Sequence, residues 1–170
     1  TWDLRRLGLP DQPKPRWLHF DPIPQPWLRE LAKRWLRWKL GTGISASHAA
    51  RQLLDLTAFA AFLATPTVGV NNLAGLSRGV LERYAAVVAA MSCTARRRSS
   101  YLATVHAFLL AIRQHRWDAT LPADAAFYPE DFPKRPSLPP RHLPEFVMAQ
   151  IEHPDNLARF GDPTSRLTTL

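Results

Sequence analysis

The sequence has little of what several common classes of protein need. Cys93 is the single cysteine among 170 residues, so no intramolecular disulfide can form and we expect a reducing, cytoplasmic compartment. No apolar run approaches the roughly 18 residues that a membrane span requires. No apolar signal segment follows Thr1. We therefore expect no association with membranes.

The signatures of metal, cofactor and nucleophile sites are missing as well. The six histidines never fall at ligand spacing with another histidine, with Cys93 or with a carboxylate. Only seven glycines are present, and none of them forms a phosphate-binding loop. No nucleophile elbow supports a catalytic triad. We therefore predict that this chain holds no metal, no cofactor and no catalytic residue.

Positive charge is abundant but unevenly distributed. The net charge is +8. Residues 1–116 contain 17 Lys and Arg against 6 Asp and Glu, whereas residues 117–170 contain 5 against 8. This asymmetry favours a basic binding module followed by a segment with a different role.

Apolar residues recur at helical spacing in four stretches, and no strand pattern is convincing. The spacing predicts helices over residues 26–40, 45–64, 77–91 and 94–117. The predicted N-caps are Ser45 or Ser47, Ser77, and Thr94. Short connections between four amphipathic helices indicate an all-α fold, a compact four-helix bundle.

Proline-rich segments flank the predicted bundle. Residues 1–25 read as an extended arm, and the bundle domain covers 26–118. Seven prolines between Pro122 and Pro144 indicate a linker over 119–144. Residues 145–170 read as the start of a truncated second domain, with a short helix from Glu145 to Glu152. Because Thr1 is not a methionine and the last residues resemble a helix cut short, we interpret the chain as part of a longer protein.

The most informative stretch is the start of the fourth predicted helix. Arg96, Arg97 and Arg98 occupy its first turn. A helix amino terminus already carries partial positive charge and unpaired N–H groups, so arginines there reduce stability. A phosphate would suit both the arginines and the free amides. We therefore predict contact with a nucleic-acid backbone.

The predicted DNA contacts come from two helix starts. Arginines can bind phosphates or, with two hydrogen bonds, guanine edges, and serine hydroxyls suit phosphate oxygens. The residues are His48, Arg51, Arg96, Arg97, Arg98, Ser99 and Ser100. Replacing Arg97 or Arg98 by alanine is expected to weaken binding while leaving helicity intact. Trp27, Trp35 and Trp38 have the spacing of core residues, and Arg29, Lys33 and Arg37 that of a solubilising face.

The order of these motifs resembles a known family. A helix with the ending Asp-Leu-x-x-Phe-x-x-Phe-Leu (SASHAARQLLDLTAFAAFL, 45–63) precedes a short helix ending in tyrosine (LSRGVLERY, 76–84). An arginine-initiated helix follows (TARRRSSYLATVHAFL, 94–109). This pattern is similar to the N-terminal core-binding, SAM-like domain of tyrosine recombinases, the phage-type integrases. Pro139–Pro144 then resembles the interdomain linker, and Thr164–Leu170 the first helix of the catalytic domain.

The resemblance implies a clamp on double-stranded DNA. The four-helix domain would pack on one face of the DNA, with contacts from the second and fourth helices, and Arg141 would add a contact from the linker. The catalytic domain, downstream of Leu170, would close on the other face. The family's catalytic arginine, lysine, His-x-x-Arg motif and tyrosine cannot be placed in this chain. It would therefore bind DNA without cutting it, while the parent enzyme would join DNA through a tyrosine–phosphate intermediate without metal or cofactor. The family also implies a nucleoid-associated location in a prokaryote or phage, and it allows a homo-oligomer on the DNA.

Two other classes of function stay open at this stage. A stand-alone helical transcriptional regulator would need a tight helix-turn-helix pair, which the long 65–76 connection disfavours. A bundle whose basic face docks an acidic protein is the other alternative. Nucleic-acid binding with a steep salt dependence would separate it from the DNA-binding classes.

Overall fold

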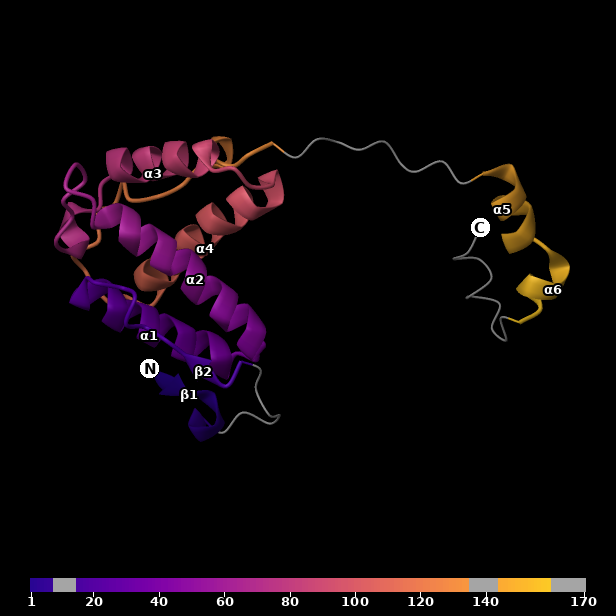
Figure 1. Ribbon diagram of the computed structural model, residues 1–170, viewed down its shortest axis with the longest axis horizontal. Helices are drawn as coiled ribbons and strands as arrows, with labels where there is room; N and C mark the ends of the chain where they lie inside the picture. Colours follow the sequence, from indigo (N-terminus) through magenta and orange to yellow (C-terminus); the bar gives the residue numbers. More distant parts are fainter. Residues whose placement is uncertain (8–14, 135–143, 160–170) are drawn as a thin grey trace. The chain divides into compact units, whose positions relative to one another are not determined.

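Four helices form the body of the first part of the chain in this computed structural model (Figure 1). They are α1 (Pro26–Gly41), α2 (Ala46–Leu63), α3 (Arg78–Ala90) and α4 (Ala95–Gln114). The structure describes residues 1–7, 15–134 and 144–159. The prediction of an all-α bundle is confirmed, with helix boundaries within a few residues of those expected.

A single apolar core joins the four helices. α2 packs against α1 and α4, and α4 also contacts α1 and α3. Trp35 of α1 meets Phe108 of α4 edge to face, with ring centroids 5.5 Å apart, and Phe59 of α2 meets Tyr84 of α3 at 4.8 Å. All four rings are fully buried. The core position predicted from spacing is therefore confirmed for Trp35, whereas it is wrong for Trp38, which is 37% exposed.

The first residues of the helices test the N-caps that were predicted from the sequence. Ser45 Oγ accepts from the His48 N–H at 3.3 Å, and Thr94 Oγ1 accepts from the Arg97 N–H at 3.2 Å, so both predicted caps are confirmed. Ser77 occupies the N-cap position of α3 as predicted, but its side chain forms no capping hydrogen bond. The Asp124 carboxylate accepts from the Arg78 N–H at 3.1 Å instead. An anion suits a helix amino terminus better than a hydroxyl, and only the tertiary fold brings it there.

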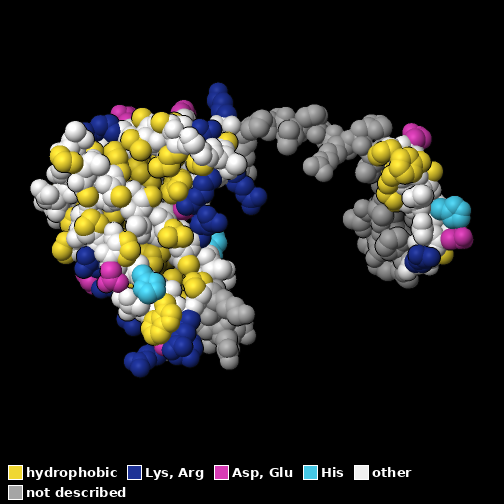
Figure 2. All heavy atoms as spheres, viewed as in Figure 1, with side chains coloured by type: hydrophobic (Ala, Val, Ile, Leu, Met, Phe, Trp, Pro, Cys, Tyr) yellow, Lys and Arg dark blue, Asp and Glu magenta, His cyan; other side chains and the backbone are white. Residues whose placement is uncertain are grey.

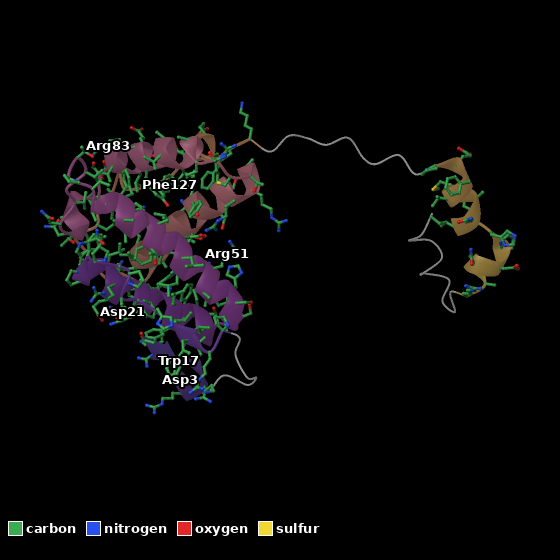
Figure 3. All side chains as sticks on the ribbon, in the orientation of Figure 1. Asp3, Trp17, Asp21, Arg51, Arg83 and Phe127 are labelled. Carbon is green, nitrogen blue, oxygen red and sulfur yellow. The ribbon has the colours of Figure 1, made fainter. Side chains whose placement is uncertain are left out.

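The N-terminal arm packs onto the bundle. β1 (Trp2–Asp3) pairs antiparallel with β2 (Trp17–Leu18), and a short 3-10 helix, η1 (Leu4–Leu7), follows β1. Asp3 and Trp17 lie together in this arm (Figure 3). Four of its apolar side chains, Leu4, Leu18, Phe20 and Ile23, are buried. The sequence did not predict this strand pair, since two-residue strands carry no periodicity.

Residues 117–134 also pack onto the bundle. The predicted linker begins at residue 119, whereas the first unit extends to Arg135. Ala125 and Phe127 are buried, and η3 (Pro129–Asp131) follows them. Arg78 holds this segment through two hydrogen bonds to the Asp131 carboxylate, at 2.6 and 2.8 Å, and one to the Ala126 carbonyl at 2.8 Å. The prolines indicated an irregular segment here. They could not predict its contact with the bundle, because Arg78 and Asp131 lie 53 residues apart in the sequence.

The second unit, Pro136–Leu170, contains two short helices in its described part. α5 (Glu145–Ile151) matches the helix predicted over 145–152, and α6 (Pro154–Leu157) packs beside it. Arg141 and the predicted helix over 164–170 lie outside the described residues. None of the helices in the described part of the chain has the length and apolar character of a bilayer span.

We predict that Asp131→Asn destabilises the fold by about 2 kcal/mol at neutral pH, since it breaks a charge-assisted pair. The hydrogen bonds from Arg78 hold the pKa of Asp131 below its usual 3.8. The pair therefore stabilises the fold above about pH 4, and its contribution is lost as the pH falls through the lowered pKa. Urea unfolding followed by circular dichroism from neutral to acidic pH measures this.

The matched control is Glu82→Gln, which removes the other carboxylate bonded to the Arg78 guanidinium. Glu82 is mostly exposed, so we expect a change below about 0.5 kcal/mol. A difference between Asp131→Asn and the unsubstituted protein that persists undiminished at low pH would contradict the assignment.

Candidate nucleic-acid interface

The amino-terminal halves of α2 and α4 lie on one edge of the first unit (Figure 1). Lys and Arg side chains gather along this edge (Figure 2). Arg51 projects there from α2 (Figure 3). The two helix starts predicted to contact DNA therefore lie on the same side of the bundle. Side-chain contacts between α2 and α4 hold them there.

A buried carboxylate fixes α2 against α4. Asp55 of α2 is fully buried, and its Oδ2 accepts hydrogen bonds from Ser100 Oγ and Thr104 Oγ1 of α4, both at 2.9 Å. Its Oδ1 faces Arg97 Nη1 at 2.5 Å, in an ion pair that is close but poorly aligned for a hydrogen bond. A buried charge needs such partners. We call these four residues the Asp55 cluster.

Arg97 therefore faces inward. Its side chain is 22% exposed, and its guanidinium lies over the Tyr101 ring, 3.9 Å from the centroid. Burial opposes the charge of Arg97, but Asp55 and Tyr101 outweigh it, so the pKa of Arg97 is raised and the cation persists. The structure gives Arg97 a positioning role between two helices, which the sequence-based interpretation did not foresee.

Arg98 has a different protein partner. Its Nη1 donates to the Ala89 carbonyl at 2.8 Å, next to the end of α3. The last carbonyls of a helix lack intrahelical partners, so this bond satisfies one of them and ties α3 to the start of α4. Of three consecutive arginines, two thus make contacts within the bundle.

The remaining predicted residues divide by exposure. Arg96, Arg51 and His48 are exposed, and none of them forms an ion pair with a residue that the structure describes. Arg51 lies one helical turn before Asp55 and so on the same face of α2. Ser99 is half-buried, and Ser100 belongs to the Asp55 cluster. The outward-facing set is therefore His48, Arg51 and Arg96.

Asp55 was the residue that sequence reasoning missed. A lone acidic residue among Leu53, Leu54 and Leu56 was the available signal, because a carboxylate in an apolar helix requires a cationic partner. In residues 1–7, 15–134 and 144–159, no three His, Cys, Asp or Glu side chains cluster closely enough to hold a metal ion.

Known proteins similar to this chain are transposases. Transposase B from transposon PsiTn554 of Staphylococcus aureus is 27% identical over 166 residues, which cover 94% of this chain and 26% of that protein. Transposase B from transposon Tn554 of Staphylococcus aureus strains Mu50 / ATCC 700699 and N315 is 26% identical with the same coverage. This chain spans about a quarter of the length of these relatives. No protein-family model and no solved structure matches it.

We predict that Arg97→Ala destabilises the fold by about 3–5 kcal/mol, because it leaves the Asp55 charge buried without its counterion. Thermal or urea unfolding followed by circular dichroism measures the change. The alanine variant of Arg97 is therefore not a clean probe of DNA binding, contrary to the expectation from sequence.

The matched control is Arg96→Ala, which removes an exposed arginine one residue earlier and should change stability by less than about 0.5 kcal/mol. Replacing both charges, as in Asp55→Leu with Arg97→Met, should recover most of the stability that Arg97→Ala loses. Equal stability of Arg97→Ala and Arg96→Ala would contradict the structural role of the Asp55 cluster.

Proposed function

We propose that this chain is the DNA-binding part of a site-specific recombinase or transposase, equivalent to the core-binding domain of a tyrosine recombinase. It clamps the duplex at the recombination site, while a catalytic domain outside this chain cleaves and joins the strands. The observation that carries this proposal is the outward-facing set, His48, Arg51 and Arg96, at two helix starts that the Asp55 cluster holds on one edge.

The electrostatics of this edge suit a phosphate backbone. The amino terminus of each helix presents partial positive charge, and neither α2 nor α4 has an acidic residue in its first turn. The exposed guanidinium groups of Arg51 and Arg96 add full charges that no described carboxylate neutralises. Phosphates are the ligands that satisfy both features at once.

The predicted contacts then separate into two kinds. Arg51, Arg96 and His48 bind the DNA, with Ser99 beside them. Arg97 and Ser100 hold α4 at its angle to α2, and Arg98 fixes the start of α4 against α3. The positioning residues affect DNA binding indirectly, because they place the DNA-binding residues. Cations that are misplaced no longer align with the phosphates.

The similarity to transposase B supports DNA recombination as the process in which the chain acts. Tyr84 is fully buried in the core, and burial raises the pKa of its phenol. Both properties are unsuitable for an attacking tyrosine, so Tyr84 does not serve as the nucleophile of this proposal. The downstream catalytic domain, the contact from Arg141 and assembly of several copies on DNA belong to the same proposal.

We predict that Arg51→Ala with Arg96→Ala weakens binding to duplex DNA while leaving the melting temperature unchanged. Fluorescence anisotropy of a labelled duplex, measured at several salt concentrations, gives the affinity and its salt dependence. Loss of two phosphate contacts should lower the slope of log K against log salt by about 1.8 and the affinity at low salt by about tenfold or more.

The control is Arg83→Ala with Lys134→Ala, which removes two exposed cations from other parts of the first unit. This variant should bind with nearly the slope of the unsubstituted chain. If both double variants lose the same affinity, the edge formed by α2 and α4 is not the interface. If the unsubstituted chain does not bind duplex DNA at low salt, the proposed function itself fails.

A further inference from the structure

A second basic surface lies on α1. A groove of about 500 Å³ runs between α1 and the N-terminal arm. It is lined by Trp2, Glu30, Leu31, Lys33, Arg34 and Arg37. We call it the α1 groove. Its one acidic residue, Glu30, is paired with Lys33 at 2.7 Å, so the charge of the remaining arginines dominates. Further Lys and Arg side chains surround the adjoining β1 and β2 (Figure 2).

The arginines of the α1 groove rest on indole rings. Arg37 Cζ lies 5.9 Å from the centroid of Trp2, and Arg34 Cζ lies 5.2 Å from that of Trp117. Neither arginine pairs with a carboxylate in the described part of the chain. An aromatic face orients a guanidinium without neutralising it, so the donors remain available to a ligand. An arginine that only increases solubility does not need an aromatic ring to orient its guanidinium.

Aromatic rings extend this surface. Trp38 is 37% exposed, and its ring centroid lies 4.8 Å from that of His115. His115 is stacked on Trp117, with centroids 5.0 Å apart and an interplanar angle of 15°. We call Trp38, His115 and Trp117 the aromatic corner. Arg34 lines the α1 groove and covers Trp117, so the two features form one surface.

The backbone beside the aromatic corner is unusual. Arg116 has φ of 49°, the only positive φ of a non-glycine residue in the described part of the chain. It follows α4 in a Schellman arrangement, with the Trp117 N–H bonded to the Ile112 carbonyl at 3.0 Å. Glycine is favoured at this position, and an arginine there reduces stability. Its presence adds an exposed cation beside the rings, and such strain points to a functional side chain.

We propose that the α1 groove and the aromatic corner bind single-stranded nucleic acid. The phosphates lie against Arg34, Arg37 and Arg116, and unpaired bases stack on the exposed rings of Trp38 and His115. A duplex keeps its bases stacked on one another and offers no ring faces along its length, so the aromatic corner favours an unpaired strand. This surface shares no residue with the α2–α4 edge and does not depend on the proposed function.

The test compares strand types in the complete 170-residue chain. Fluorescence anisotropy follows the binding of a short labelled single strand and, separately, of a duplex of the same sequence. For Arg34→Ala with Arg37→Ala, we expect single-strand affinity to fall about tenfold, the salt slope to fall by about 1.4, and duplex affinity to stay within about twofold. Arg34→Lys with Arg37→Lys keeps both charges and should retain most of the salt slope.

Stacking has its own readout. An unlabelled single strand should quench the tryptophan fluorescence of the chain, and Trp38→Leu should reduce this quenching. The charge control, Arg83→Ala with Lys134→Ala, should leave single-strand affinity within about twofold.

Three results would overturn the proposal. Equal losses on the single strand and the duplex would mean that the surface attracts any polyanion. Displacement of the strand by polyglutamate at the same charge concentration would favour an acidic protein as partner. Unchanged single-strand binding in the Arg34 and Arg37 variants would exclude the surface altogether.

Discussion

The bundle depends on one buried charge. Asp55 is fully enclosed between α2 and α4, where its carboxylate meets Arg97, Ser100 and Thr104. A carboxylate is costly to bury without compensation, so this contact admits one register of α4 along α2 far more readily than any other. Apolar residues alone would tolerate sliding, because they fit many neighbours about equally well. The relative placement of the two helix starts, and with it the spacing of Arg51 and Arg96, follows from this cluster.

The run of three arginines illustrates how one sequence motif divides into different roles. An anion was expected near Arg96, Arg97 and Arg98, because cations destabilise a helix amino terminus. For Arg97 that anion is Asp55 of the same chain, and for Arg98 the acceptor is the Ala89 carbonyl. Only Arg96 points to solvent. Side chains on adjacent helical positions differ by about 100° in direction, so a run of identical residues always faces several environments.

Irregular segments on both sides of the bundle contribute to it through long-range contacts. Leu4 and Phe20 of the arm are buried, as is Phe127 of the segment after α4, and Arg78 links α3 to Asp131. The arm also supplies Trp2 to the α1 groove. Proline restricts these segments enough to lower the entropy of ordering them, while a few buried side chains fix their position. The α2–α4 edge and the α1 groove therefore both consist of helical residues whose positions depend on contacts distant in the sequence.

The sequence by itself determined the helices, their order, the two cap residues Ser45 and Thr94, and the excess of positive charge, because these follow from periodicity and from contacts within one turn. The similarity of the motifs to recombinases also agreed, in general terms, with the transposase relatives. Only the tertiary structure decided which arginines face outward and where the first unit ends. Those outcomes depend on Asp55, Asp124 and Asp131, which contact partners 42 to 53 residues away. No local pattern encodes such pairs, since their energies exist only once the chain has folded.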